Sequence, residues 1–336
     1  MAKDPKGYAP TEFQLAFVAE STKGTANTTT MQLMNADVIT MPNLNPVIVN
    51  ETRTGTGRVR KVADAFICQK GIVKTIPFSG IPDTTVLPLL VQNIMSNTVD
   101  TGPASYDVPY NYTPPEILNG AGSGNITQTV TVAMVSPEGS NSIIFPGCVL
   151  TKLTLEAGID EENGRFKMSG EFQTRHIHSD KAVAPSSMVA YGSTYYYITT
   201  LTGKTTFAGI ADCVIDAVNL DLENPTSYSG FNSNGDPDSI NRGVDGGFRA
   251  DMMATIKYDA ATAVLNADLV DGGTAALIEV SDNVTWASVT NNAFAVKSDN
   301  AIISSVAFNE RSSMYLDVMV EMGSDGSTDD VIELVV

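Results

Sequence analysis

Residues 145–172 read FPGCVLTKLTLEAGIDEENGRFKMSGEF, and this stretch decides the fold class. In its last part, the apolar residues Phe166, Met168 and Phe172 alternate with polar or small residues. Such two-residue alternation predicts a strand with one buried face and one face open to solvent or to a partner. The acidic turn GIDEENG (158–164) separates this strand from a preceding apolar run, so the stretch predicts a β-hairpin.

The same alternation recurs near the C-terminus, where residues 316–322 read LDVMVEM. Between these segments the chain is rich in Thr, Ser, Asn, Val and Ile, and is interrupted by Gly and Pro. β-Branched residues favour strands, and Gly and Pro mark the turns between them. The sequence therefore predicts a mainly β fold.

The composition limits what the chain can be. Its 336 residues suit two domains or one large β unit, and 43% of them are hydrophobic, which excludes bulk disorder. The formal charge is 20 − 38 = −18. A nucleic-acid-binding surface needs Lys and Arg to displace counterions from phosphates, so most of this surface is expected to repel DNA. Neither a membrane-spanning run nor a secretory signal is expected.

Two segments are predicted to be helical. Residues 84–97 follow Asp83, which suits an N-cap, and residues 260–271 follow Asp259 and stop at a pair of glycines. The first 35 residues are polar and lack periodicity, so they are predicted to form an extended arm.

Two long segments, 100–125 and 224–247, are rich in Pro, Gly and Asn and are predicted to be loops. Loops of this length are uncommon in compact domains unless they have a function, so contacts between subunits are expected there.

The two halves of the chain share a pattern. Apolar residues occupy the first, fourth and sixth positions of LTKLTL (150–155) and of ISSVAF (303–308), and each segment precedes a turn and an alternating strand. One predicted helix lies upstream in each half. These similarities indicate an internal duplication. The segment IDAVNL (215–220) also fits the spacing, which leaves the register of the repeat open.

Several motifs, taken in order, resemble the major tail tube proteins of long-tailed phages. FPGCVL (145–150) matches the aromatic-x-Gly-Cys step before their central hairpin. TFAG (206–209) and VNLDLEN (218–224) are similar to the strand pair that opens their second half, and residues 242–250 fit the strand that follows. The likeness spans roughly residues 36–322. The Lys-rich or aromatic strand ends of that family are sparse here, which leaves the subfamily open.

The resemblance implies two tandem β-sandwich or half-barrel lobes, each with one short helix, which complete a barrel with neighbouring subunits. Their expected bounds are 36–190 and 203–336, after the arm of residues 1–35. A trimer of duplicated chains gives a ring of six lobes, whereas single-lobe chains require a hexamer. Rings stack into a tube because a contact between unlike surfaces does not close.

The resemblance also implies a role and partners. The chain is expected to be a structural virion protein of the tail, assembled in the bacterial cytoplasm, whose hollow tube conducts DNA. Its expected partners are further copies of itself, the tape measure protein and DNA transiently in the lumen, and tail terminator and distal tail proteins at the ends. No enzymatic activity, cofactor, metal or membrane partner is expected.

Strands with one polar and one apolar face can form the wall of a channel. The polar positions of the two hairpins are predicted to face the lumen: Lys152, Thr154, Lys167, Ser169, Glu171, Ser305, Asp317 and Glu321. The apolar positions are predicted to form the hairpin core: Leu153, Leu155, Phe166, Met168, Phe172, Val306, Phe308, Leu316, Val318 and Val320.

Motifs for chemistry are weak. His176 and His178 share one face of a predicted strand, but a metal site needs a third ligand, and none is evident nearby. A solvent-facing pair is the simpler interpretation. Cys148 and Cys213 lie in apolar segments and are expected to fill the core.

Two alternative functions remain open at this stage. A tail terminator or distal tail ring protein has the same lobe but forms a single ring. A carbohydrate-binding surface β-sandwich belongs to another class, and glycan binding would reveal it.

Overall fold

The computed structural model shows a mainly β protein built around a large antiparallel sheet. The structure describes residues 9–42, 44, 47–50, 65–68, 72–95, 105–108, 117–118, 129–183, 188–231, 237, 239–244, 247–265, 276–289, 293–310, 313–324, 326 and 330–336. Most of the first predicted loop, 100–125, therefore lies outside the described residues, as do residues 1–8 of the predicted arm. Most of the second, 224–247, is described, and the loop prediction is wrong for part of it, because the strands Thr226–Ser229 and Ser239–Arg242 pair with each other there. Among the described residues, no helix is long and apolar enough to cross a membrane.

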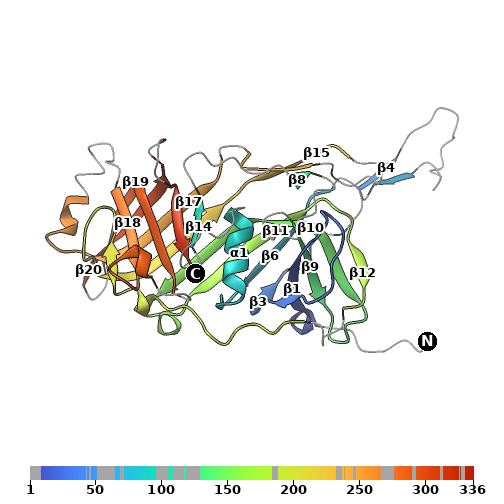
Figure 1. Ribbon diagram of the computed structural model, residues 1–336, viewed down its shortest axis with the longest axis horizontal. Coiled ribbons are helices and arrows are strands. Elements are labelled where there is room, and N and C mark those ends of the chain that lie inside the picture. The colour runs from blue at the N-terminus through green and yellow to red at the C-terminus, as the bar shows by residue number, and fades with distance from the viewer. Residues whose placement is uncertain are drawn as a thin grey trace.

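The main path of the sheet has the strand order β13–β18–β19–β20–β17–β14–β10–β11–β6–β3 (Figure 1). In that order the strands are Lys204–Thr206, Ala276–Ser281, Ala295–Glu310, Met314–Gly323, Arg249–Lys257, Ile215–Glu223, Ser142–Gly158, Lys167–Thr174, Lys74–Gly80 and Ala36–Ile39. The pairing of β10 with β14 joins the N-terminal part of the chain to the C-terminal part.

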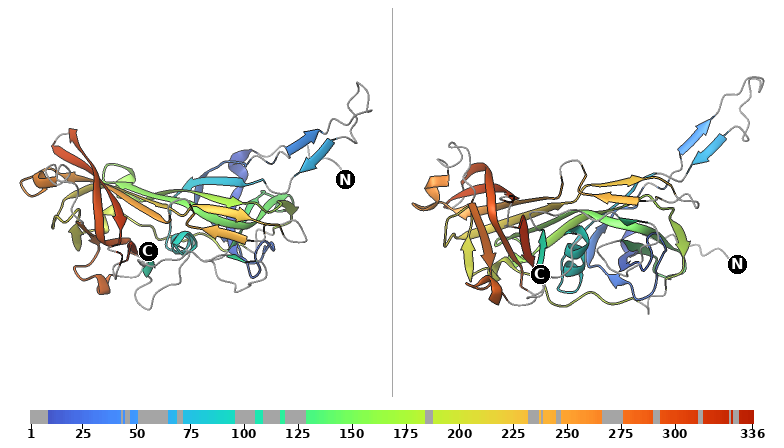
Figure 2. Two further views of the ribbon diagram at one scale, coloured as in Figure 1. Left: turned by 90° about the horizontal axis from the view of Figure 1, so that it is seen from above. Right: turned by 45° about the horizontal axis from the view of Figure 1, so that its top comes forward.

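Further strands extend this sheet or lie beside it. β9 (Val130–Val135) and β12 (Ser179–Lys181) pair with the N-terminal part of β10, β1 (Gln14–Ala19) pairs with β9, and β2 (Gln32–Leu33) pairs with β1. β21 (Ile332–Val335) pairs with β19, and β7 (Ser105–Val108) pairs with β21. β15 (Thr226–Ser229), β16 (Ser239–Arg242) and β8 (Ile117–Leu118) form a three-stranded sheet. β4 (Val47–Asn50) and β5 (Ala65–Cys68) form a separate hairpin that projects from the body (Figure 2).

Short 3-10 turns punctuate the chain between these strands. They are η1 (Pro10–Glu12), η3 (Glu162–Gly164), η5 (Ile198–Thr200), η6 (Thr262–Val264) and η7 (Trp286–Ser288). The second predicted helix, 260–271, contains η6 in its described part, and its residues 266–271 lie outside the described residues.

The first predicted helix is present as α1 (Val86–Met95). The carboxylate of Asp83 accepts hydrogen bonds from the backbone N–H groups of Thr85 and Val86, at 2.8 and 3.0 Å, so it caps the helix as predicted. At the other end, the buried Arg242 donates to the carbonyl oxygens of Asn93 and Ile94. A cation there satisfies carbonyls that have no partner within the helix.

The segment of residues 14–19 differs from the expected arm. It forms β1, which pairs with β9 along its whole length, and Leu15, Ala16 and Phe17 are buried. The apolar run LAFV (15–18) is too short to show a period. Leu15 and Phe17 pack in the main core, and Ala16 and Val18 belong to a second apolar cluster on the other side of the strand. This part of the chain therefore belongs to the packed body.

The predicted hairpin core is largely buried. Leu153, Leu155, Phe166, Met168, Phe172, Leu316, Val318 and Val320 are each at most 2% exposed. Val306 is half-buried against the same core. The core assignment of Phe308 is wrong, because its side chain is 55% exposed. It lies near the turn of the β19–β20 hairpin, where the Tyr258 ring packs edge-on against it.

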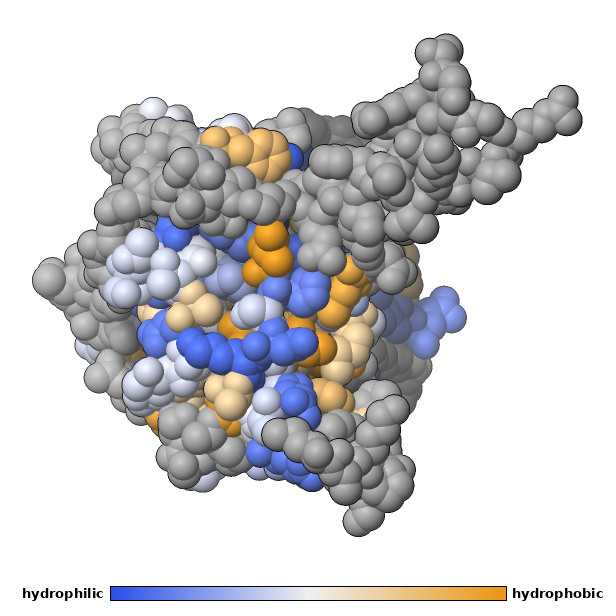
Figure 3. All heavy atoms as spheres, turned by 90° about the vertical axis from the view of Figure 1, so that its right-hand side faces the viewer, coloured by the Kyte–Doolittle hydropathy of each residue, from blue (hydrophilic) through white to orange (hydrophobic). Residues whose placement is uncertain are grey.

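The right-hand end of the molecule, around β9 and β12, has a mixed surface (Figures 1 and 3). Hydrophilic residues run between separate hydrophobic ones, so the described part of this end carries no broad apolar patch. The main sheet, by contrast, has one continuous polar side that crosses several strands.

Candidate functional site

One side of the main sheet is polar from β11 to β19. Residues paired across strands point to the same side, so the register defines this surface, which we call the polar sheet face. It comprises Lys152, Thr154, Glu156, Lys167, Ser169, Glu171, Asn219, Asp221, Glu223, Arg249, Asp251, Met253, Thr255, Ile302, Ser305, Ala307, Asp317, Met319 and Glu321.

The positions predicted to face a lumen all lie on this one surface. Lys152, Thr154, Lys167, Ser169 and Glu171 come from the first hairpin, β10–β11. Ser305, Asp317 and Glu321 come from the second hairpin, β19–β20. None of these side chains is buried. β14 and β17 lie between the two hairpins and contribute residues that the hairpin pattern did not include. The charged residues among them are Asp221, Glu223, Arg249 and Asp251.

A row of carboxylates crosses the centre of this face. Asp221, Asp251 and Glu321 lie directly opposite one another on β14, β17 and β20. The hydroxyl of Thr154 donates a hydrogen bond to Asp221. Partial burial raises the pKa of Asp251, and the like charges of Glu321 and Asp221 raise it further. Repulsion between these like charges therefore destabilises the folded sheet.

The basic residues of the face lie beside carboxylates. The ammonium of Lys167 is 3.3 Å from a Glu161 carboxylate oxygen and 3.7 Å from one of Glu162. Its hydrogen bond to Glu161 raises the pKa of Lys167. Lys152 lies between Glu171 and Glu223 in the register of the strands. These carboxylates reduce the positive potential that either lysine presents to a phosphate.

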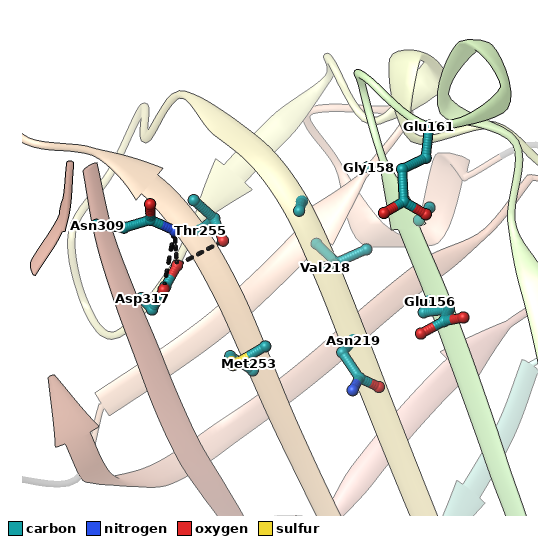
Figure 4. Close-up of a pocket in the computed structure, with 11 residues that line it drawn as sticks. Glu156, Gly158, Glu161, Val218, Asn219, Met253, Thr255, Asn309 and Asp317 are labelled. Carbon is teal, nitrogen blue, oxygen red and sulfur yellow. Dashed lines mark hydrogen bonds between the residues drawn. The ribbon is translucent and has the colours of Figure 1, made fainter. Parts of the chain in front are cut away.

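A hollow of about 280 Å³ opens on the same face (Figure 4). Its lining includes Glu156, Asn219, Met253 and Asp317. The carboxylate of Asp317 accepts hydrogen bonds from the Thr255 hydroxyl at 2.7 Å and from the Asn309 amide at 3.0 and 3.1 Å. These bonds hold the Asp317 carboxylate in place at the edge of the hollow.

The expectation that the two histidines face solvent as a pair is wrong, because neither side chain is exposed. His176 is buried between Gly24 and Gly147, while His178 is partly buried and packs near the Phe145 ring. Burial lowers the pKa of His178, and the charge of Lys74 lowers it further. In the described ranges, no group of three or more His, Cys, Asp or Glu side chains is placed to hold a metal ion.

The sequence patterns did not indicate one buried acidic residue, Glu20. Its carboxylate accepts hydrogen bonds from the backbone N–H groups of Gly24 and Gly147, at 2.7 and 2.8 Å, and from the hydroxyls of Thr129 and Thr131, at 2.7 and 2.8 Å. Burial raises the pKa of Glu20, and these four donors oppose that shift. The bonds tie the end of β1 to β9 and to the bend of β10, so the role of this group is structural.

Both described cysteine side chains are buried thiols. Cys148 and Cys213 form no disulfide, and burial raises the pKa of Cys213 to about 11. A protonated, enclosed thiol packs as a small apolar group and is a poor nucleophile.

Comparisons with known proteins add no relative. No protein-family model matches the chain, and no curated protein matches it.

Proposed function

We propose that this protein is the major tail tube subunit of a long-tailed phage, with the polar sheet face lining the channel. The observation that supports this best is a single antiparallel sheet that runs through both halves of the chain. One side of that sheet packs on the core, and the other side is polar and acidic. A wall of a water-filled channel needs this division between its two sides.

The charges of the face suit a channel through which DNA slides. Phosphates bind where Lys and Arg displace counterions, and a channel lined with such sites would retain the duplex. On the polar sheet face, the lysines lie beside carboxylates, and the central row is acidic. Such a wall repels phosphate and leaves the duplex free to move.

The two hairpins support a tandem duplication. Each apolar motif contains one extra residue that bulges out of the strand pairing, Thr151 in β10 and Ser304 in β19. The hydroxyl of Thr151 donates to the Glu171 carbonyl at 3.1 Å, and the hydroxyl of Ser304 donates to the Met319 carbonyl at 3.3 Å. These bonds occupy equivalent positions in the two repeats.

The long strands support the duplication in a second way. β10 pairs with β9 and β12 up to Cys148, and with β11 and β14 after it. β19 pairs with β18 and β21 up to Ala301, and with β20 from Asn300 onward. With Leu150 aligned to Ile303, both strands change partners at the same point. Two such lobes in each chain favour a trimeric ring with pseudo-sixfold symmetry.

The ends of the sheet offer a means of closing such a ring. In the part of the chain that the structure describes, β19 pairs only with β20 beyond Ala301, so residues 302–310 present an open strand edge. β3 forms the opposite end of the sheet path. Open edges pair with strands of other chains, so we propose that these two edges join between subunits.

Electron microscopy of the purified chain at rising concentration, with native mass measured in parallel, tests the proposal. Hollow tubes built from rings of three chains are the expected result. Rings of six chains would contradict the duplication while keeping the tube. Single rings that never stack would instead indicate a terminator or distal ring. A monomer that binds glycans in a screen would indicate the carbohydrate-binding alternative.

A further inference from the structure

Two small residues account for the hollow on the polar sheet face. Gly158 of β10 is paired with Ala217 of β14. The same row of the sheet continues through Thr255 of β17 to Asp317 of β20. Glycine and alanine leave the floor of this row low, whereas the neighbouring row of the lining carries the longer Met253 side chain. The result is a depression of about 280 Å³ that reaches from β10 to β20.

Carboxylates lie at two ends of this hollow (Figure 4). Glu156 of β10 is at one end, and Asp317 of β20 is at the other. Neighbouring strands are about 4.8 Å apart, so three strand spacings separate the backbones of these residues by roughly 14 Å. The hydrogen bonds that Thr255 and Asn309 donate to Asp317 come from neutral groups, so its negative charge remains for a ligand.

Between these two ends the lining is apolar or accepts hydrogen bonds. The Met253 side chain is 40% exposed and lies between Asn219 and Asp317 (Figure 4). Asn219 is opposite Glu156, and within the described residues no donor reaches its buried Oδ1 atom. A buried acceptor without a donor costs free energy, so a ligand that donates a hydrogen bond to this atom is favoured.

The charges of the hollow suit an extended cation. Its described lining contains no Lys or Arg. Lys167 is opposite Glu156 on β11, but its ammonium lies beside Glu161 and Glu162. A single metal ion binds oxygen atoms at about 2.0–2.6 Å, so it does not reach from Glu156 to Asp317. Separate ammonium groups joined by a chain can reach both carboxylates.

We infer that the hollow binds an aliphatic diamine or polyamine. One ammonium group binds Glu156 and the Oδ1 atom of Asn219, another binds Asp317, and the methylene groups between them cover Ala217 and Met253. Hydrogen bonds between ammonium and carboxylate groups are the strong ones, and the methionine side chain adapts to a methylene chain. A lysine side chain carries a single ammonium group, so it satisfies only one end of the hollow.

Isothermal titration calorimetry with three dications tests the inference. The probes are 1,8-diaminooctane, 1,3-diaminopropane and Mg²⁺, which carry the same charge but differ in length. The long diamine is expected to bind as one molecule per chain. The short diamine and Mg²⁺ are expected to bind about tenfold more weakly, because neither reaches both carboxylates. Equal affinities for the three dications would overturn the inference, since general attraction to an acidic surface does not depend on length.

NMR of labelled methionine methyl groups locates the ligand. The Met253 signal is expected to shift when 1,8-diaminooctane is added. Met314 is 44% exposed but points to the other side of the sheet, so its signal is the internal control. Met253→Leu and Met314→Leu assign the two signals. A shift of Met314 that equals the shift of Met253 would overturn the inference.

Ala217→Leu fills the hollow without changing the charge. This variant is expected to weaken binding of the long diamine by about tenfold or more, because the added side chain occupies the ligand's place. Ala307→Leu is the matched control. Ala307 is exposed on the same face, opposite Asp317 on β19, and does not line the hollow. The control is expected to bind as wild type does, and equal losses in both variants would overturn the inference.

Glu156→Gln removes one carboxylate at an exposed position, where the fold does not depend on it. Binding of the long diamine is expected to weaken by about fivefold. Glu223→Gln makes the same change of charge at an exposed position of the same face, outside the hollow. It is expected to have little effect. Similar losses in the two variants would show that net charge alone attracts the diamine and would overturn the inference.

The hollow lies within one chain, so its ligand does not depend on the tube proposed above. Diamine binding by a chain that forms neither rings nor tubes in electron microscopy would support this site and contradict the tube. Normal tubes from a chain that binds no diamine would overturn this inference and leave the tube standing.

Discussion

Gly147 lies at the bend where β10 passes from one set of partners to the other, and its φ is +64°. Its N–H donates to the buried Glu20 carboxylate at 2.8 Å. A Cβ atom at this position would lie 2.1 Å from the Cδ2 atom of His176. Position 147 therefore requires glycine for two reasons. Its backbone is left-handed, which favours glycine, and the buried His176 ring leaves no space for a Cβ atom.

Replacing this glycine tests both reasons. Gly147→Ala is expected to lower the free energy of unfolding by about 3 kcal/mol or more, because the methyl group displaces His176 and disturbs the Glu20 bonds. Gly209→Ala is the matched control, with a φ of +78° but only the Ala276 Cβ near its added methyl, at 3.9 Å. The control is expected to cost about 1 kcal/mol from backbone strain alone. Urea unfolding measures both, and equal losses would contradict the role assigned to His176.

For Phe308, the alternation predicts the correct side of the sheet, but the prediction that its side chain is buried is wrong. Phe308 pairs with Leu316, which is fully buried, so both lie on the core side of the sheet. β20, which carries Leu316, lies between β17 and β19, whereas the part of β19 that carries Phe308 pairs, among the described residues, only with β20. Phe308 therefore lies at an open edge of the sheet and is exposed. Alternation predicts to which side of the sheet a side chain points. Whether that side chain is buried depends on which neighbouring elements cover it.

At the scale of the element, the spacing i, i+3, i+5 indicates a bulged strand. A regular strand would place residues three apart on opposite sides. In β10, β14 and β19 one extra residue after the first apolar position restores the same side. The third match, at residues 215–220, thus has the same physical origin as the other two. The hydroxyl bonds of Thr151 and Ser304 distinguish the two hairpins from that third strand.

The carboxylate row predicts a pH dependence of stability. The pKa of Asp251 is raised in the folded chain, so folding is disfavoured while this group is ionised. Asp251→Asn is therefore expected to stabilise the protein at pH 7, by about 0.5–1 kcal/mol. The difference from wild type should disappear as the pH falls through the raised pKa of Asp251 and then its ordinary range, because wild-type Asp251 then becomes neutral.

Thermal unfolding followed between pH 7 and acid conditions measures this effect. Glu138→Gln is the control, because Glu138 is an exposed carboxylate in the β9–β10 turn, away from the row. A stabilisation by Asp251→Asn that persists unchanged in acid, or that Glu138→Gln reproduces, would contradict the repulsion across the row.

At the scale of the whole molecule, the distribution of charge decides what the polar sheet face repels. The net charge of −18 repels DNA at long range. The carboxylate row repels phosphates that come close to the polar sheet face. Replacing two row carboxylates by lysine (Asp251→Lys with Glu321→Lys) is expected to create DNA binding at low salt, and this binding should weaken steeply as salt is added.

A matched control keeps the net charge equal. Glu138→Lys with Asp180→Lys makes the same change of charge at exposed positions outside the face. Gel-shift titrations at several salt concentrations compare the two double variants. Similar DNA binding by both would show that net charge alone excludes DNA and would contradict a special role for the face.

The mainly β class, the two alternating hairpins and the cap of α1 follow from the order of the amino acids alone. The same order also determines which side of each hairpin strand is polar. These features depend on residues close together in the chain, where a period of two or a capping side chain acts directly on the local backbone.

The way in which these elements combine is visible in the three-dimensional structure but not in the sequence pattern. The tertiary fold placed β14 and β17 between the two hairpins, and so brought Asp221, Asp251 and Glu321 into one row and Met253 opposite Met319. It also drew residues 14–19 into the body and buried Glu20. Pairing between distant strands follows from the packing of a common core and the satisfaction of buried polar groups, and no local pattern in the chain encodes that choice.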